Sequence, residues 1–485
     1  MLFTSPLFLF VFLPVFIAAY YAVPATSNAR NHVALAASVL FFAWGEPLFV
    51  FALIAFTYVD YRASLAIAPD SSVSPRLKKV ILTAAICLAV AMLIASKYLT
   101  FIVAEILKPQ NIKLDVPNIP LYLGISFITF HRISYLVDSY KGRAVPPRHF
   151  LDCALYIFLF PQLIAGPIIR YHDIGSQIQH RTHTVEGFLS GFFRFSVGMA
   201  KKLIIADPMG GVADKIFALP ADGVSFAFAW GGVMAYTLQI YFDFSGYSDM
   251  AVGLGRMMGF RFPENFNRPY ISRSVTEFWR RWHISLSNWM RVYLYIPLGG
   301  NRHSEARTYA NLWIVFLISG FWHGASWNFV AWGAYYGLFL SLERAAAVHE
   351  RFRIALPALL QQAITVLIVM VGWVFFRSPT LTYAVKYIGA MFGVEGSGAA
   401  LLTPWGFIFG NREMVTLVIA CLIAFVPLPA AWSPWRSLQA SWSGATGSRG
   451  SATLGFEFVA TALLLFLCSS AIVSSDYAPF LYFRF

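Results

Sequence analysis

The chain has 485 residues, of which 58% are hydrophobic, 17% are aromatic and only 12% are charged. Soluble domains carry roughly a quarter of their residues as charged side chains, so this composition excludes an ordinary soluble enzyme and predicts a polytopic, all-α membrane protein. The net charge of +13 is typical of cytoplasmic loops that face anionic lipid. Nucleic-acid binding is disfavoured, because no basic soluble domain is present to carry it.

The cysteines and the N-terminus add two exclusions. Four scattered cysteines form no Cys-x-x-Cys pair, so the sequence predicts neither a zinc site nor a disulfide framework, and we expect no bound metal. The first apolar run, at 5–23, is long enough to cross a bilayer and has no basic region before it. We therefore expect a retained first span rather than a cleaved signal peptide.

Apolar runs continue along the whole chain and predict about eleven membrane spans in one integral-membrane domain, residues 1–485. Basic residues between the early runs, at 30, 76–79 and 141–148, fall on one side of the membrane if each run crosses once. That side is the cytoplasm, which places the N-terminus outside it. The apolar runs are 5–23, 33–44, 48–66, 80–105, 119–138, 187–205, 225–258, 308–322, 326–346, 355–376, 413–430 and 452–473. The run at 33–44 is short for a full crossing, which leaves about eleven spans.

Two segments depart from this pattern. Residues 151–169 contain Pro161 and the pair Gly166-Pro167 inside an apolar stretch, which predicts a broken or re-entrant segment. Non-helical backbone at membrane depth is tolerated only where protein or a cavity covers it. The stretch at 431–451, rich in Ser, Trp and Gly, is expected to be a surface loop.

The run at 225–258 holds two acids, Asp243 and Asp249, within one apolar span. Ionisable residues at membrane depth are costly, so both are expected to face the protein interior and to pair with arginine or hydroxyl groups. A structural ion pair is one interpretation of these carboxylates, and a place in a substrate or donor site is the other.

Residues 256–307 contain nine arginines and three glutamates but no lysine. The choice of arginine favours forked contacts with carboxylate or phosphate groups. Within this belt, 277–293 has the spacing of one amphipathic helix with an apolar, tryptophan-rich stripe. An interfacial helix with a solvated basic face has the same pattern, but the tryptophans favour a buried polar face. That face would carry Arg280, His283, Ser287 and Arg291.

A second histidine, His323, lies in the long apolar run 318–337, between Gly320 and Gly324. A histidine in such a run is either a functional residue or one that a backbone carbonyl satisfies between packed helices. The flanking glycines allow another helix to pack closely. We also expect them to leave room for a carrier arm or an acceptor to reach the imidazole.

These features together suggest acyl transfer. A histidine can act as a general base toward a sugar hydroxyl, with an acyl thioester as the electrophile. Arginines at the entrance would hold the phosphates of coenzyme A or of a phosphopantetheine group. The chain has no Gly-x-Ser-x-Gly elbow, which disfavours a serine hydrolase, and no His-Glu-x-x-His motif. A metal shared by His283 and His323 has little support.

Several motifs resemble those of the membrane-bound O-acyltransferase (MBOAT) family, and in particular its membrane subunits that O-acetylate alginate. The likeness covers essentially the whole chain, both ends included, and is densest at 120–345. The motifs are Phe-Pro-Gln-Leu-Ile-Ala-Gly166-Pro, Tyr-Ser-Asp249-Met-Ala-Val-Gly-Leu-Gly, Phe-Pro-Glu-Asn-Phe-Asn-Arg268-Pro-Tyr, Arg-Arg-Trp-His283-Ile-Ser-Leu-Ser, Tyr-Ile-Pro297-Leu-Gly-Gly-Asn and Gly-Phe-Trp-His323-Gly.

The resemblance implies a ring of about eleven transmembrane helices around a central tunnel, in a bacterial inner membrane, with a periplasmic N-terminus. It implies that His323 is the catalytic histidine and that His283 is the family's second characteristic histidine. An acetyl group would pass from cytoplasmic acetyl-CoA or a carrier-bound thioester, with no tightly bound cofactor, to an exported polysaccharide, helped by periplasmic partner proteins. We expect binding residues among Arg280, Arg281, Ser287, Asn288, Arg291, Trp322, Asn328, Asp243 and Asp249.

Two alternatives stay open. An acyltransferase for lipid or for a cell-wall polymer (teichoic acid or peptidoglycan) would share the fold, but its acyl label would appear in lipid or wall rather than in a secreted polymer. A transporter would show solute flux without acyl turnover, and Asp243 and Asp249 would matter more to it than His323.

Overall fold

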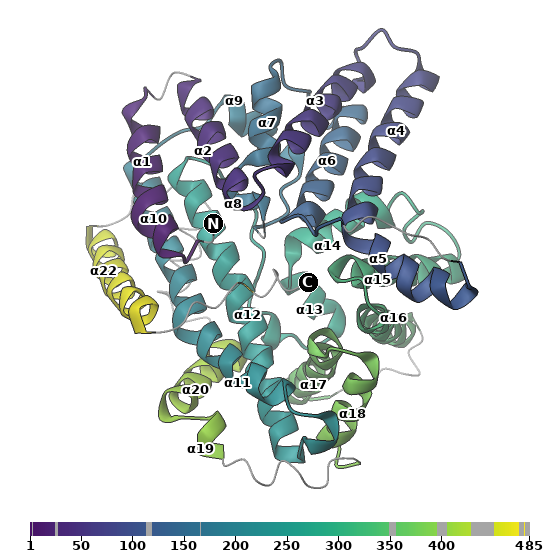
Figure 1. Ribbon diagram of the computed structural model, residues 1–485, viewed down its shortest axis with the longest axis vertical. Coiled ribbons are helices and arrows are strands. Elements are labelled where there is room, and N and C mark those ends of the chain that lie inside the picture. The colour runs from purple at the N-terminus through teal and green to yellow at the C-terminus, as the bar shows by residue number, and fades with distance from the viewer. Residues whose placement is uncertain are drawn as a thin grey trace. The chain divides into compact units, whose positions relative to one another are not determined.

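The computed structural model describes residues 1, 3–24, 28–112, 119–164, 166–348, 356–394, 405–427, 451–474 and 480. Within these ranges the regular structure is entirely helical, as the composition predicts (Figure 1). The residues group into two compact units. Unit 1 comprises 1–195 and 247–263, and unit 2 comprises 196–246 and 264–485. Residues 431–450 of the loop expected at 431–451 lie outside the described residues.

Unit 1 contains most of the early apolar runs. Pro47 follows α2 and separates it from α3, as the sequence predicts, and the run expected at 80–105 is part of one longer helical stretch, 75–110. Helices α3, α4 and α6 lie side by side (Figure 1). The helices are α1 (Leu13–Ala22), α2 (Ala29–Gly45), α3 (Phe49–Ile67), α4 (Pro75–Leu93), α5 (Leu99–Phe101), α6 (Ile125–Tyr140), α7 (Phe150–Phe158), α8 (Phe160–Leu163) and α9 (Tyr171–Gln179).

The segment at 151–169 is broken, as predicted. Helix α7 ends at Phe158, the backbone of Leu159 leaves the helical conformation, and α8 is a single turn with Pro161 near its start. Proline is tolerated there because the first turn of a helix needs no backbone N–H from it. The side chains of this segment from Cys153 to Ile164 are buried, so protein covers the irregular backbone.

Two long helical stretches contribute residues to both units. Helix α10 (Val185–Ala200) continues through a π-helical turn, Lys201–Ala206, into α11 (Asp207–Phe217), so this stretch is longer than the expected span at 187–205. Helix α12 (Phe226–Met257) is unbroken. Residues 247–257 of α12 belong to unit 1 and the rest to unit 2.

Unit 2 holds the remaining helices. Helices α15 and α16 form an antiparallel pair joined by a short connection at 324–326, and α17 packs on α16. Two short helices, α18 and α19, were not predicted. The helices are α13 (Val275–Arg281), α14 (Ile284–Met290), α15 (Glu305–His323), α16 (Trp327–Val348), α17 (Ala358–Arg377), α18 (Leu381–Met391), α19 (Trp405–Ile408), α20 (Asn411–Phe425) and α22 (Ser451–Ser474).

The prediction of one helix over 277–293 is wrong. The chain breaks at Trp282, which is extended, and at His283, whose φ of 43° lies in the left-handed region. Helix α13 ends before the break, and α14 begins after it. Side chains on either side of the break therefore do not share one helical face.

Four of the described helices are long and apolar enough to cross a membrane: Phe49–Ile67, Pro75–Gln110, Ala358–Arg377 and Gly455–Val473. A shorter apolar helix covers Phe8–Ala22. Several other long helices carry buried polar side chains that lower their hydropathy. Helix α12, for example, contains Gln239, Asp243 and Asp249, all buried. The count of about eleven spans stays a prediction.

Candidate active site

His323 is the last residue of α15, and aromatic rings surround its imidazole. Its side chain is 5% exposed. The ring centroid lies 4.8 Å from that of Trp322, 5.1 Å from that of Trp332 on α16 and 5.1 Å from that of Phe376 on α17. All four residues belong to unit 2. The structure thus places this histidine among aromatic side chains of α15, α16 and α17.

The glycines beside His323 serve helix packing. A Cβ at Gly320 would lie 2.2 Å from the backbone oxygen of Phe329, and a Cβ at Gly324 would lie 2.0 Å from the Phe329 ring. Helix α16 therefore fills the space on that side of α15. The expectation that Gly320 and Gly324 leave room for a carrier arm or an acceptor is wrong, because Phe329 occupies that room.

His283 lies at the break between α13 and α14 and is 1% exposed. Its Nδ1 is 3.0 Å from Oδ1 of Asn265. The ring makes an edge-to-face contact with Phe244 of α12, with centroids 4.7 Å apart. Residues 264–304 lie outside the candidate membrane spans, and burial lowers the pKa of His283 to about 3. The ring is therefore neutral at pH 7.

Trp322 links the two histidines. Its ring centroid lies 4.8 Å from that of His323 and 6.4 Å from that of His283. The structure therefore brings both predicted histidines around one buried indole within unit 2, although 40 positions separate them in the sequence. Among the described residues, no group of three or more His, Cys, Asp or Glu side chains could hold a metal ion.

Helix α13, which leads to His283, is anchored to α16 at its start. The Glu343 carboxylate accepts hydrogen bonds from the backbone N–H of Val275 and from the N–H and hydroxyl of Thr276, the latter two at 2.8 and 2.7 Å. The backbone N–H groups of Val275 and Thr276 lie in the first turn of α13, where the helix itself offers them no acceptor. Further along α13, Trp279 packs edge-on against Trp332, with centroids 5.5 Å apart. Helix α16 therefore fixes both α13 and the wall behind His323.

The other polar residues predicted for this region do not gather around His283. Arg280, Asn288 and Arg291 are exposed. Arg281 pairs with Glu277 at 2.8 Å, and the Ser287 hydroxyl donates to the backbone oxygen of Trp279 at 3.2 Å. The expected polar face with Arg280, His283, Ser287 and Arg291 is wrong, because the break at His283 turns its side chain away from the others.

Asn328 is buried and connects two helices. Its Nδ2 donates to the backbone oxygen of Ser378 at 2.6 Å, just past the end of α17. Ser378 in turn donates its hydroxyl to Val374. This bond joins the start of α16 to the end of α17, next to the aromatic residues that contact His323. The side chain of Asn328 therefore makes a structural contact between two helices. Binding of the donor or substrate by Asn328 stays a prediction.

The two acids of α12 form separate buried ion pairs. Asp249 pairs with Arg194 of α10, with Nη2 2.8 Å from Oδ1, within unit 1. Asp243 pairs with Lys202 at 2.8 Å, and the same Lys202 ammonium lies 2.7 Å from Asp207, within unit 2. Pairing with arginine is confirmed for Asp249, whereas Asp243 pairs with a lysine that the sequence analysis did not consider.

Replacing Asp249 with alanine is expected to destabilise the protein by about 3–5 kcal/mol, because it leaves the Arg194 guanidinium buried without its carboxylate. Thermal unfolding of the detergent-purified protein measures this loss. Asp222 is the matched control, since it is 77% exposed and pairs with Lys386 at the surface. Its replacement by alanine should change stability by about 0.5 kcal/mol or less. Equal stability of both variants would argue against a structural role for Asp249.

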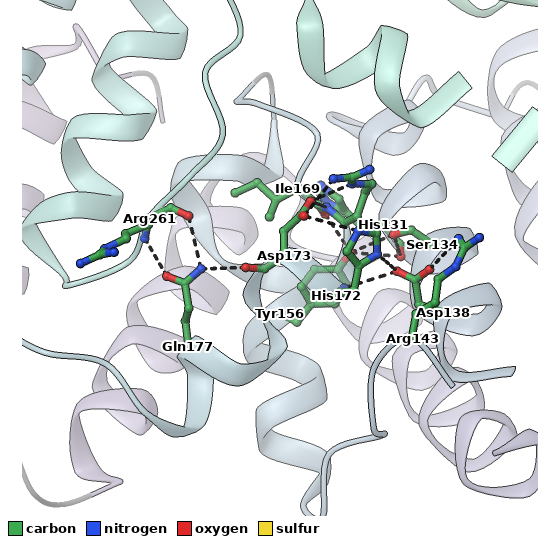
Figure 2. A network of polar contacts seen from close by, with 11 residues as sticks. His131, Ser134, Asp138, Arg143, Tyr156, Ile169, His172, Asp173, Gln177 and Arg261 are labelled. Atoms are coloured by element: carbon green, nitrogen blue, oxygen red, sulfur yellow. Dashed lines mark hydrogen bonds and ion pairs between the residues drawn. The ribbon is translucent and has the colours of Figure 1, made fainter. Parts of the chain in front are cut away.

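A partly buried polar network in unit 1 was not predicted from the sequence (Figure 2). Asp138 at the end of α6 accepts a hydrogen bond from Nδ1 of His172 at 2.7 Å and lies 3.5 Å from Arg143. Tyr156 donates to the backbone oxygen of Ile169 at 2.9 Å. One turn or more away on α6, Arg132 forms a forked pair with Asp60 of α3. The polar residues 131, 132 and 138 inside the apolar run 119–138 were the available signal.

Comparison with known proteins identifies the class of protein. Residues 80–384 match the model of the MBOAT, membrane-bound O-acyltransferase family, and the chain belongs to that family. It is therefore an O-acyltransferase and a multi-pass membrane protein.

Several relatives match the chain over its full length. It is 41% identical to the probable alginate O-acetylases of Azotobacter vinelandii and of Pseudomonas putida, over 100% of this chain and of each relative. A peptidoglycan O-acetyltransferase of Helicobacter pylori is 34% identical over 100% of this chain and 98% of its own length. The similarity is thus not confined to the segment that carries the two histidines.

Proposed function

We propose that this protein O-acetylates an exported, alginate-like polysaccharide, using an acetyl group that arrives as a thioester from the cytoplasm. The observation that carries the proposal is the 41% identity to alginate O-acetylases over the whole of both chains. The paired histidines around Trp322 support it, because they supply a buried imidazole of the kind that acyl transfer to a hydroxyl needs.

In the proposed reaction, His323 acts as the general base. The acceptor hydroxyl oxygen attacks the thioester carbonyl carbon while its proton passes to the imidazole. The carbon–sulfur bond then breaks, the leaving sulfur takes the proton back from the imidazolium, and an acetyl ester and a free thiol remain. The position of His323 suits this role, since its imidazole lies in the same buried cluster of side chains as Trp322 and His283.

The donor is proposed to be acetyl-CoA or a carrier-bound acetyl thioester, with no tightly bound cofactor. Both donors carry phosphate groups, and Arg280 and Arg291 are exposed arginines near the His283 segment that could bind them. Arg281 is less suited, because Glu277 already pairs with it. Replacing Arg280 and Arg291 with glutamine tests this assignment. If these arginines bind the donor phosphates, the KM for the donor should rise in the variants.

The proposed setting is the bacterial inner membrane, with a periplasmic N-terminus and the whole chain, 1–485, acting as one acyltransferase domain. About eleven spans would surround a central tunnel that connects a cytoplasmic donor with an extracytoplasmic acceptor. Periplasmic partner proteins would complete the transfer to the polymer. Family membership and the apolar helices support this arrangement.

A second candidate acceptor is peptidoglycan, which the full-length similarity to a peptidoglycan O-acetyltransferase favours. Deleting the gene and measuring ester-linked acetate in both polymers by mass spectrometry separates the two. Loss of acetate from the exported polysaccharide alone supports the first proposal, and loss from peptidoglycan alone supports the second. Radiolabel from acetyl-CoA in membrane lipid would instead indicate a lipid acceptor, and unchanged acetate in every fraction would contradict acyl transfer by this chain.

A further inference from the structure

The hydrogen bonds around Asn265 determine which nitrogen of His283 carries hydrogen. Oδ1 of Asn265 accepts from the Ser285 backbone N–H at 3.2 Å and from the Ser285 hydroxyl at 2.8 Å, and it lies 3.0 Å from His283 Nδ1. A backbone N–H can only donate, so the amide atom that faces it must be the oxygen and not the nitrogen. An amide oxygen can only accept, so His283 Nδ1 must be the donor.

The backbone of Asn265 reinforces this arrangement. Its main-chain oxygen accepts from the N–H of Ile284 at 2.9 Å, and the N–H of Asn267 donates to the oxygen of Arg281 at 2.9 Å. Asn265 and its neighbour Asn267 thus bind the chain on both sides of the helix break. His283 itself has a left-handed backbone, with φ 43°, which costs a non-glycine residue of the order of 1 kcal/mol or more. Such strain persists only where the surroundings impose it.

We propose that Asn265 is a positioning residue that holds His283 as the Nδ1–H tautomer and so presents Nε2 to the acyl-transfer site as a hydrogen-bond acceptor. This inference rests on the proposed function, in which the two histidines around Trp322 form one acyl-transfer site. An acceptor at Nε2 can accept the hydrogen of a second hydroxyl of the acceptor, beside the one whose proton passes to His323, and so hold the attacking oxygen in place. The opposite tautomer would present a donor there and could not accept that hydrogen.

Two aromatic side chains among the described residues pack against the ring of His283. Phe244 from α12 and Trp322 from α15 face the imidazole, and neither side chain is charged at any ordinary pH. Asn265, from the segment before α13, is the polar partner of Nδ1. Replacing its neutral amide with a carboxylate would therefore change the charge beside the ring without changing the acceptor geometry.

The test compares Asn265→Ala and Asn265→Asp with the wild type in membranes that contain the full chain and its partner proteins. [14C]Acetyl-CoA is the probe, and label in the polysaccharide is measured over a pH series. Asn265→Ala is expected to lower transfer by about 10- to 100-fold, as is typical when the partner that orients a functional histidine is removed. Asn265→Asp keeps an accepting oxygen and should restore transfer, but only at higher pH.

The shift with Asn265→Asp has a definite sign. A carboxylate beside Nδ1 stabilises the imidazolium and raises the pKa of His283, so the inactive protonated ring persists to higher pH. The acid limb of the pH–rate profile therefore moves upward. A purely structural role for Asn265 would lower the amount of folded protein without moving this limb.

Asn311→Ala is the matched control, because Asn311 is also fully buried and its Nδ2 donates to the backbone oxygen of Gly300 at 2.9 Å. It should lose stability but keep the wild-type pH profile per folded molecule. An unshifted acid limb in Asn265→Asp, or wild-type transfer by folded Asn265→Ala, overturns the inference. If the wild-type chain itself transfers no acetyl to polymer in cells, the proposed function fails, and this outcome is separate from any effect of the variants.

Discussion

Replacing His323 with asparagine is expected to lower polysaccharide O-acetylation by about 10²- to 10⁴-fold, the contribution typical of a general base. Full-length protein should still accumulate in the membrane. Asparagine keeps part of the volume that Trp322, Trp332 and Phe376 enclose, but it cannot take a proton at neutral pH. Alanine at the same position should lower acetylation equally and reduce stability further, because it leaves a cavity among these rings. Ester-linked acetate per unit of membrane protein is the measurement.

The control for His323 is His180→Ala, which removes an exposed histidine of unit 1. That variant should acetylate the polymer at the wild-type level. Normal acetylation by His323→Asn would contradict the assignment of the base. Loss of the protein from the membrane in His323→Asn, with activity per molecule unchanged, would show that the residue stabilises the fold and takes no part in proton transfer.

Replacing Gly320 with alanine is expected to prevent the normal pairing of α15 and α16. The added Cβ would lie 2.2 Å from the Phe329 backbone oxygen and 3.1 Å from the Gly333 backbone. Backbone atoms cannot move aside as a flexible side chain can, so the helices must separate. Overpacking typically costs about 1–3 kcal/mol, occasionally more, and we expect the upper end here. Thermal unfolding in detergent and acetylation in cells should both decrease.

Gly211 provides the matched control for Gly320. It lies within helix α11, and a Cβ there would meet nothing within 4 Å. Alanine is favoured over glycine inside a helix by about 0.5–1 kcal/mol, so Gly211→Ala should be neutral or slightly stabilising. If Gly320→Ala unfolds at the same temperature as the wild type and Gly211→Ala, then close packing at Gly320 does not hold the helix pair together.

The sequence predicts the helices well where local chemistry decides them. Apolar runs are long enough to identify most helices of both units, and Pro47 marks the break between α2 and α3. The broken segment at 151–169 follows from Pro161 in the same way. Hydropathy is less informative about α6, because its buried Arg132 and Asp138 pair with residues from other parts of the chain. The Arg132–Asp60 pair joins residues 72 positions apart, and no local pattern reveals it.

The break at His283 shows why the helix prediction failed. No glycine or proline stands between Phe278 and Tyr293, and the apolar spacing continues through the break. What ends α13 and starts α14 is Asn265, whose two oxygens bind the N–H groups of Ile284 and Ser285. This competitor for the backbone comes from some 20 residues earlier in the chain. The apolar repeat of a helix depends only on the residues within that segment. It therefore cannot predict a hydrogen-bond partner that comes from another part of the chain.

By itself, the sequence determined that this is an all-helical membrane protein with two histidines in family-specific motifs, because composition, apolar runs and short motifs are local properties. Only the tertiary structure decided that both histidines contact Trp322, that Asp243 and Asp249 lie in separate ion pairs, and that Phe329 fills the space beside Gly320 and Gly324. These facts depend on which side chains meet across distant parts of the chain, and packing between helices sets them.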